Sequence, residues 1–344
     1  MPDPIFQDQE HYRAQFTKGL ENLLRVEQLG AFILVLANST YDPQIHAALG
    51  CQLQQRFDEL SLKVKDLLSQ GRSLEYADDD VPVFLKLMAI GLDNLQNTLF
   101  RKAGPWEIQF NHLRAFRPAR MSSVVITDLL APFDENGFHF NKPFLNKEII
   151  WEGELLGDHC RLLYNKFPFA PLHGLLVIEP EKNHPQYLSR SAHEHYWRLL
   201  ELLGNTLTDC GFGYNARGAC SSINHLHVQM YAGKTGGYPV EQSMWRHNGG
   251  NQEYPLNVAC FESASLSWQH IEQLHQQNHA YNLLYRPGKV YVIHRAMQGG
   301  CQQKEGLSAH AWAETSGSMT VFNREIFELL SAEEIAEELA RMHP

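Results

Sequence analysis

The chain has six cysteines among its 344 residues, and no two of them stand close enough to form a C-x-x-C pair. This spacing gives no sign of a zinc ribbon or of a redox-active dithiol. A reducing cytoplasm is therefore the simplest compartment for the protein. The cysteines lie at positions 51, 160, 210, 220, 260 and 301.

Long apolar runs and a basic leader are also missing. The longest apolar run, residues 31–37, is much shorter than the roughly 20 residues that a membrane-spanning helix needs. The first residues, Met-Pro-Asp-Pro, lack the basic region of a signal peptide. We therefore expect no membrane partner.

Positive charge is scarce, since 29 Lys and Arg residues stand against 39 Asp and Glu residues, for a net charge of −10. General nucleic-acid binding needs a basic footprint, so we expect no nucleic-acid partner. The exception is segment 101–120, where five basic residues stand against Glu107 alone. A solvated surface is the plain alternative, but the arginines favour phosphate contacts because guanidinium groups bind phosphate in bidentate fashion. The five are Arg101, Lys102, Arg114, Arg117 and Arg120.

The motif HLHVQ is the most informative stretch of the chain. Polar and apolar residues alternate there, which predicts a strand with successive side chains on opposite faces. His225, His227 and Gln229 would share one face, and the apolar residues between them would face the core. The preceding segment, 211–222, is rich in small residues that let a bulky anionic group approach the backbone. Two imidazoles and an amide beside such a loop suggest chemistry at phosphorus.

Other roles for the histidines were weighed. An H-x-H pair on a strand also occurs in zinc sites, but further ligands would have to come from elsewhere. A second pair, His193 and His195, lies in a stretch with helical spacing, where residues two apart do not face each other. His275 and His279 have a zinc-like spacing of four, but a solvated helix face explains them better because no H-E-x-x-H frame is present.

The chain divides into three predicted parts. Residues 1–103 form a helical N-terminal region, which we interpret as an accessory layer or a dimerisation element. Residues 104–240 combine strands with one crossing helix, and residues 241–344 repeat this order in a weaker form. Two such rounds, of which only the first keeps the histidines, predict a duplicated α+β fold. Among the predicted elements are a helix over 83–99 and a last strand over 313–322.

The stretch GYNARGACSSINHLHVQMY resembles the transferase branch of the histidine triad superfamily, whose motif is H-x-H-x-Q. Within that branch, QFNHLR, PFDENGFHFNK, AYNLLYRPGKVYVI and AWAETSGSM follow the order seen in the GDP-hexose phosphorylases, including the plant GDP-L-galactose phosphorylases. The likeness runs over residues 109–319. Diadenosine tetraphosphate phosphorylases and galactose-1-phosphate uridylyltransferases are more distant relatives, sharing H-x-H-x-Q and a duplicated fold. One departure is PLHGLLVIEP, where relatives usually have glycine before the residue that is His173 here.

The resemblance implies a duplicated histidine-triad-like antiparallel sheet fold with an N-terminal helical extension. It also implies that His227 attacks the α-phosphorus of a nucleoside diphosphate sugar, with GDP-hexose favoured and inorganic phosphate as the acceptor. His225 would orient the site, and Gln229 would hold a non-bridging oxygen, since an amide cannot act as an acid. The zinc-binding cysteines of some uridylyltransferases have no counterpart here, so we expect no metal and no cofactor.

Three functional alternatives remain at this point. One is a dinucleoside tetraphosphate phosphorylase, which would use a dinucleotide substrate. The others are a hydrolase of nucleotide conjugates and a non-enzymatic nucleotide-binding protein. A homodimer is possible. The residues expected to bind substrate are Asn111, Arg114, Tyr214, Asn215, Gly218, Ser221, Ser222 and Asn224.

Overall fold

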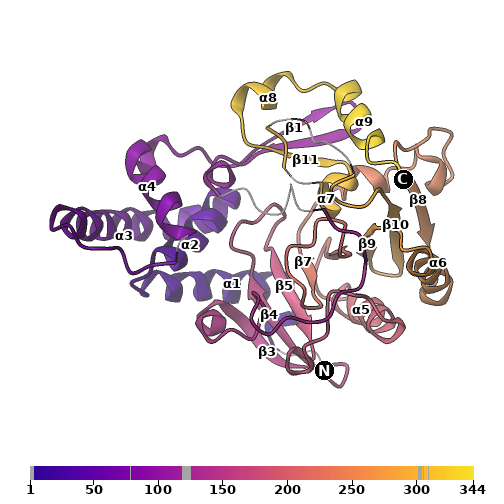
Figure 1. Ribbon diagram of the computed structural model, residues 1–344, viewed down its shortest axis with the longest axis horizontal. Coiled ribbons are helices and arrows are strands. Elements are labelled where there is room, and N and C mark those ends of the chain that lie inside the picture. Colours follow the sequence, from indigo (N-terminus) through magenta and orange to yellow (C-terminus); the bar gives the residue numbers. More distant parts are fainter. Residues whose placement is uncertain (1–3, 78, 118–124, 301–303, 305, 309) are drawn as a thin grey trace.

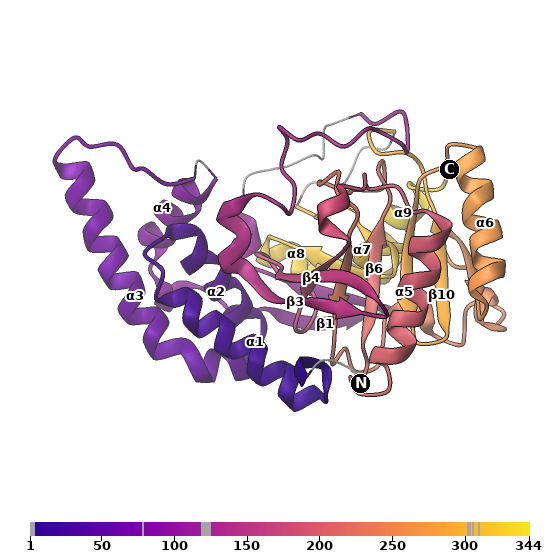
Figure 2. The same cartoon turned by 90° about the horizontal axis from the view of Figure 1, so that it is seen from below.

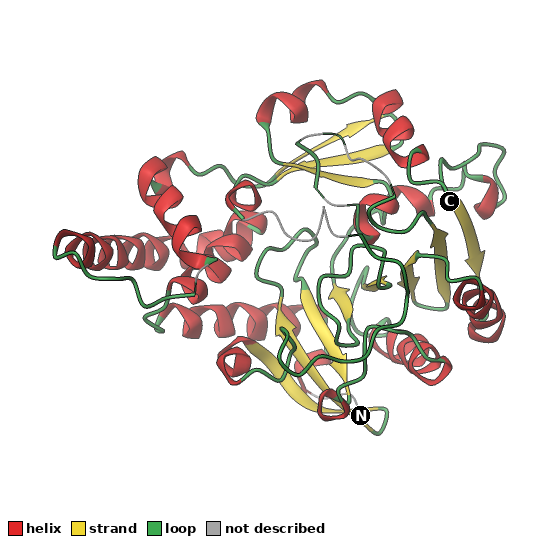
Figure 3. Ribbon diagram, viewed as in Figure 1, coloured by secondary structure: helices red, strands yellow, loops and turns green. Residues whose placement is uncertain are grey.

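The computed structural model describes residues 4–77, 79–117, 125–300, 304, 306–308 and 310–344. Among the described residues, α-helices gather at one end of the molecule and a large sheet occupies the other (Figures 1 and 3). Arg120, one of the five basic residues of segment 101–120, lies outside the described residues. The predicted α+β class with N-terminal helices is confirmed.

Four helices form the N-terminal layer at the left of Figure 1. They are α1 (Gln9–Leu24), α2 (Leu29–Tyr41), α3 (Pro43–Ser69) and α4 (Asp80–Ile90). Helix α2 holds the apolar run of residues 31–37 and is buried along almost its whole length, so the run forms a core helix. Asp42 ties two helices together, because its carboxylate caps α3 through the N–H of Gln44 and also pairs with Arg13 of α1 at 2.5 Å.

The predicted helix over 83–99 is too long. Helix α4 ends at Ile90 because Gly91 follows it with a φ of 75°, a backbone conformation that favours glycine. A 3-10 turn, η2 (Leu92–Asn94), comes next, and strand β1 (Leu99–Ala103) begins where the helix was expected to end. The apolar residues that suggested one long helix are therefore divided between two elements.

Eight strands form the large sheet, in the order β3-β4-β5-β7-β6-β9-β10-β8. Their pairings are all antiparallel. The strands are β3 (Ile149–Leu155), β4 (Asp158–Tyr164), β5 (Gly174–Ile178), β6 (Gly211–Asn215), β7 (Val228–Tyr231), β8 (Asn257–Phe261), β9 (Tyr281–Arg286) and β10 (Lys289–His294). Helices α5 (Arg190–Leu203) and α6 (Ala264–Gln276) contact each other beside this sheet, at the right of Figure 2.

The sheet is built from two copies of one unit. The order strand, helix, strand, strand occurs first as β5-α5-β6-β7 and again as β8-α6-β9-β10. In space the copies read β5-β7-β6 and β9-β10-β8, so they meet symmetrically where β6 pairs with β9. Strand β10 takes the place of β7 in the second copy, and its central residues, Val290 to Val292, include no histidine. The predicted duplication is confirmed.

A smaller sheet joins distant parts of the chain, at the top of Figure 1. Strand β1 forms a hairpin with β2 (Trp106–Phe110), and β2 pairs in parallel with β11 (Ser318–Val321). The predicted strand over 313–322 is therefore half wrong, because α7 (Trp312–Thr315) comes first and Gly317, with a φ of 93°, turns the chain into β11. Helices α8 (Arg324–Leu329) and α9 (Ala332–Ala340) follow.

The predicted division into three parts cuts through local structure. The boundary at 103/104 falls within the β1–β2 hairpin, and the boundary at 240/241 falls within the 3-10 helix η6 (Pro239–Glu241). The three-part division itself stays a prediction. In the part of the chain that the structure describes, no helix combines the length and the apolar character needed to cross a membrane.

Candidate active site

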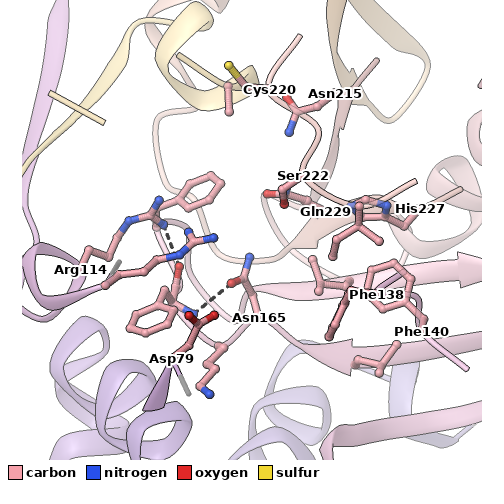
Figure 4. A pocket seen from close by; sticks show the side chains of 18 of the residues that line it. Asp79, Arg114, Phe138, Phe140, Asn165, Asn215, Cys220, Ser222, His227 and Gln229 are labelled. Atoms are coloured by element: carbon pink, nitrogen blue, oxygen red, sulfur yellow. Dashed lines mark hydrogen bonds between the residues drawn. The ribbon is translucent and has the colours of Figure 1, made fainter. Parts of the chain in front are cut away.

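A cavity of about 640 Å³ lies beside the HLHVQ motif. Its wall comes from several parts of the chain: the motif itself, the 3-10 helix η3 (Leu113–Phe116), the start of α4, and the C-terminal segment around α7. Figure 4 shows His227, Gln229 and Ser222 on one side and Arg114 across from them. Asn215 and Cys220 lie at one end of the cavity in the same view.

The motif is not a strand along its whole length. Strand β7 begins only at Val228, because the backbone of the two preceding residues bonds to the loop that follows β5. The N–H of Leu226 donates to the carbonyl of His184 at 2.8 Å, and the N–H of His227 donates to Gln186 Oε1 at 2.9 Å. The apolar residues of the motif are buried as expected, with Leu226 only 4% exposed.

The imidazole of His227 is held in one orientation and one tautomer. Its Nδ1 lies 2.8 Å from the carbonyl oxygen of His225, and a carbonyl only accepts, so Nδ1 carries the proton. Nε2 then has a free lone pair, and it forms no hydrogen bond with the described residues. Burial lowers the pKa of His227 to about 4, so the ring is neutral near pH 7. A neutral imidazole with Nε2 unprotonated is the form that attacks phosphorus.

The side chain of His225 does not reach the cavity. It is 1% exposed, its Nδ1 accepts the N–H of Phe140 at 3.2 Å, and burial lowers its pKa to about 3. The ring of Phe140 packs against both histidines, with its centroid 5.0 Å from that of His227. His225 therefore acts on His227 through its backbone carbonyl, whereas its side chain fixes the segment that carries Phe140.

Gln229 presents its amide N–H groups to the cavity because its oxygen is occupied. The indole N–H of Trp312, in α7, donates to Gln229 Oε1 at 2.9 Å. His173 Nε2 lies 3.1 Å from the same oxygen. Since His173 Nδ1 accepts the N–H of Phe169, Nε2 carries the proton and is the second donor to Gln229. His173 stands where the sequence departs from its relatives, and here it orients the amide of the motif.

Three arginines bring positive charge to the cavity wall, which also carries the carboxylates of Asp79, Asp80, Glu148 and Glu314. Arg114, Arg117 and Arg295 all line it, and none forms an ion pair with a carboxylate of the described residues. Burial, and then the charge of Arg117, lower the pKa of Arg114 to about 10, so Arg114 is still charged at pH 7. Its Nη1 donates to the carbonyl of Phe167 at 2.8 Å, and its guanidinium lies 4.9 Å from the ring centroid of Phe169. These contacts fix the guanidinium of Arg114, whose nearest interacting carboxyl, Glu314, lines the same cavity without pairing with it directly.

The expected substrate-binding residues fall into two groups. Arg114, Asn215 and Ser222 line the cavity together with His227 and Gln229. The others lie behind the wall. Asn111 accepts the N–H of Arg114 at 3.2 Å, and the hydroxyl of Tyr214 faces Gln186. Gly218 packs on Met297, and the hydroxyl of Ser221 donates to the carbonyl of Ile223. Asn224 forms hydrogen bonds with Ala131, Pro132 and Gln186.

The sequence did not single out several residues of the wall. Arg295 lines the cavity and Trp312 holds Gln229 from behind the wall, and both follow the second copy of the fold, more than 60 residues after the motif. Phe138, Phe140 and Phe144 form a continuous aromatic surface that starts at His227, with ring centroids 6.3 and 6.1 Å apart. Phe138 and Phe140 lie in the segment PFDENGFHFNK, and Trp312 lies in AWAETSGSM. The resemblance of these two segments to relatives was the signal in the sequence that could have pointed to the three residues.

Comparison with known proteins identifies the part of the chain that carries this site. Residues 103–231 match the family model described as "GDPGP1-like, N-terminal domain". This range runs from the end of β1 to the end of β7 and includes the whole HLHVQ motif. Residues 103–231 are therefore similar to a GDPGP1-like N-terminal domain.

Individual relatives agree with this result. GDP-D-glucose phosphorylase 1 of Danio rerio is 32% identical over 144 residues, which cover 41% of this chain. The chain spans only 40% of the length of that relative. The crystal structure of yeast Ap4A phosphorylase Apa2 is similar with a TM-score of 0.52 at 17% identity, covering 78% of this chain and 95% of that one.

The Apa2 structure in complex with Ap4A gives a TM-score of 0.51 at 17% identity, covering 78% of this chain and 98% of that one. At this identity the likeness shows the fold. The family model, the relative and the solved structures are all of phosphorylases of the histidine triad superfamily. The resemblance predicted from the sequence is confirmed.

Proposed function

We propose that this protein is a nucleotidyl-transferring phosphorylase that cleaves a nucleoside diphosphate hexose with inorganic phosphate. The observation that carries the proposal is the free Nε2 of His227, which faces a cavity that Arg114, Arg117 and Arg295 also line. A nucleophile opposite guanidinium groups suits an anionic phosphorus centre. The match to a GDP-D-glucose phosphorylase supports GDP-hexose as the substrate.

In the first step, Nε2 of His227 attacks the α-phosphorus of the substrate. A P–N bond forms, and the bond from this phosphorus to the bridging oxygen breaks. The electron pair leaves with that oxygen, so hexose 1-phosphate departs and a nucleotidyl-histidine remains. Arg114 lies across the cavity from His227 and would stabilise the negative charge on the phosphoryl oxygens.

In the second step, an oxygen of inorganic phosphate attacks the same phosphorus. The P–N bond breaks, its electron pair returns to Nε2, and a nucleoside diphosphate is released. Gln229 donates N–H groups throughout, because Trp312 and His173 occupy its oxygen. It cannot give a proton to a leaving group, which suits transfer to phosphate better than hydrolysis.

A dinucleoside tetraphosphate is the second candidate substrate. The observation that favours it is the fold match to yeast Ap4A phosphorylase, which covers 95% of that chain. The same His227 chemistry applies to both substrates, and they differ in the group that leaves. Hydrolysis of nucleotide conjugates would require water as the acceptor in place of phosphate.

One substrate screen separates these reactions. GDP-glucose, ADP-glucose and diadenosine tetraphosphate are incubated with the protein, with and without inorganic phosphate, and nucleotide products are resolved by chromatography. We expect nucleoside diphosphate from a nucleotide sugar only when phosphate is present. Release of nucleoside monophosphate at an equal rate with and without phosphate would establish hydrolysis and overturn the phosphorylase. We keep the cytoplasm and a homodimer as proposals on the sequence arguments given above.

A further inference from the structure

One carboxylate on the wall of the cavity lacks any partner. Glu148 ends the 3-10 helix η4 (Pro143–Glu148) and is partly buried. It lines the same cavity as His227 and forms neither a hydrogen bond nor an ion pair with a described residue. A partly desolvated carboxylate is costly unless donors satisfy its oxygens, so a group that the cavity receives is the natural source of those donors.

Nearby cations do not neutralise this carboxylate. Lys166 also lines the cavity, but its ammonium forms an ion pair with Asp80. Burial raises the pKa of Glu148, and the longer-range charges of Lys166 and Lys147 only partly oppose this rise. The carboxylate of Glu148 can therefore accept hydrogen bonds from a ligand in the cavity.

Three phenylalanine rings lead from the nucleophile to η4, the 3-10 helix that ends at Glu148. The ring of Phe140 lies 5.0 Å from His227, Phe138 lies 6.3 Å from Phe140, and Phe144 lies 6.1 Å from Phe138. We call Phe138, Phe140 and Phe144 the aromatic lobe. Phe138 is 49% exposed and Phe144 is 56% exposed, so both rings offer free faces for a planar group to stack on.

The local helix brings the aromatic lobe and the carboxylate together. Phe144, Leu145 and Glu148 belong to one short 3-10 helix, which has three residues per turn. Leu145 and Glu148 are three residues apart, so they lie on one side of it, and both line the cavity together with Phe144. A planar ring stacked in the aromatic lobe would therefore share this part of the cavity wall with Glu148.

We propose that the aromatic lobe binds guanine and that Glu148 accepts hydrogen bonds from its N1–H and its 2-amino group. Guanine presents two adjacent N–H donors on its Watson–Crick edge, and these match the two oxygens of a carboxylate. Adenine places an acceptor, N1, beside its amino group, which a carboxylate repels. Cytosine likewise has an acceptor beside its amino group, and uracil has one N–H between two carbonyls. Hydrogen bonds from two N–H groups to a carboxylate are charge-assisted, and such bonds are stronger than hydrogen bonds between neutral groups.

This inference rests on the proposed function, which supplies a nucleotide as the ligand of the cavity. Because it concerns only how the base is recognised, nucleotide binding tests it without any turnover. GDP, IDP and ADP are titrated into the wild-type protein and into Glu148→Gln by calorimetry. IDP lacks only the 2-amino group of GDP. The matched control is Glu154→Gln, which removes the charge of an exposed glutamate on the adjoining strand β3.

We expect the wild-type protein to bind GDP most tightly, then IDP, then ADP. Glu148→Gln should weaken GDP binding by about ten- to a hundredfold, which is the usual worth of hydrogen bonds to a charged group. The affinity for ADP should not fall, because a glutamine amide offers a donor to N1 of adenine. Glu154→Gln should bind all three nucleotides as the wild-type protein does.

Two results would overturn the assignment of Glu148. One is a wild-type protein that does not prefer GDP to ADP, which needs no variant and so does not depend on variant folding. The other is a Glu148→Gln protein that binds GDP unchanged, or that loses GDP and ADP affinity equally. A clear GDP preference in a protein that shows no phosphorolysis would instead leave Glu148 assigned and refute the proposed reaction.

Discussion

The indole N–H of Trp312 donates to Gln229 Oε1 over 2.9 Å, joining the C-terminal part of the chain to the motif that carries the nucleophile. Because the oxygen is held, the amide N–H groups of Gln229 stay directed to the cavity. Trp312 also stacks on Tyr231, with ring centroids 5.6 Å apart and planes 9° from parallel. One side chain thus fixes both the amide and the strand that bears it.

Trp312→Phe should separate these two contributions. Phenylalanine keeps most of the stacking but removes one of the two donors to Gln229 Oε1, so His173 alone is left to hold the amide. We expect kcat to fall by about threefold to tenfold, the effect of one neutral hydrogen bond, with little change in KM. Trp197→Phe is the matched control, because its indole donates to Glu201 on helix α5, away from the cavity. An unchanged kcat in Trp312→Phe would show that the bond does not position Gln229.

The two histidines of the motif should behave differently when each is removed. Incubated with substrate and no phosphate, the wild-type protein should accumulate a nucleotide on His227, seen by intact-mass spectrometry as an acid-labile adduct. His227→Ala should form no adduct. His225→Ala should still form it, more slowly, because alanine keeps the backbone carbonyl that accepts from His227 Nδ1. An adduct that persists in His227→Ala would place the nucleophile elsewhere.

Arg114 should contribute to substrate binding through its charge. Arg114→Ala should lower kcat/KM by a factor that corresponds to about 1.5–3 kcal/mol of lost transition-state stabilisation, the usual worth of a charge-assisted contact. Arg114→Lys should recover only part of the loss, because an ammonium cannot replace the planar stack on Phe169. Arg198→Ala serves as the control, since Arg198 is exposed on helix α5. If Arg114→Ala matched the control in steady-state kinetics, the segment would be ordinary surface.

The protein should lose stability on mild acidification. Burial lowers the pKa of seven histidines to about 3 or about 4, against 6.5 in the unfolded chain. Between pH 6.5 and 4 the unfolded state therefore binds more protons than the folded state, and the free energy of unfolding falls as the pH falls. The seven are His173, His193, His225, His227, His275, His294 and His310.

Urea unfolding at fixed ionic strength from pH 7.5 to 4.5 would measure this loss. Glu148 and Glu314 work in the opposite direction, because burial raises the pKa of each carboxyl, but they are two groups against seven. Ordinary carboxylate ion pairs weaken mainly below about pH 4.5, outside most of this range. A stability that stays level or rises between pH 6.5 and 5 would contradict the expectation.

Local patterns in the sequence predicted most elements correctly, and the misses have both local and distant physical causes. The alternation in HLHVQ correctly buried Leu226 and Val228. It could not show that the backbone of His227 bonds to Gln186, 41 residues earlier, in place of a neighbouring strand. The helix over 83–99 failed for a local reason, because Gly91 ends α4 and only the last predicted residue, Leu99, pairs with β2. Hydrogen-bond partners that come from distant segments leave no local signature.

The candidate site divides along the same line. His227, Gln229, Arg114, Asn215 and Ser222 were named from the sequence and line the cavity. Their supports were not, because a residue such as Trp312 acts on Gln229 across 83 positions of the chain. The role of His173 was open for a similar reason. Only its distance to Gln229, 3.1 Å, shows what it orients.

The parallel pairing of β2 with β11 has a consequence for how the protein comes into being. Glu107 lies opposite Ser318, and their side chains bond across 211 positions of the chain. A ribosome that has made the nucleophile must therefore still make about 90 residues before the wall that holds Gln229 and closes the cavity exists. Until then the nascent chain exposes the apolar side of β2, so we expect this protein to depend on chaperones during its synthesis.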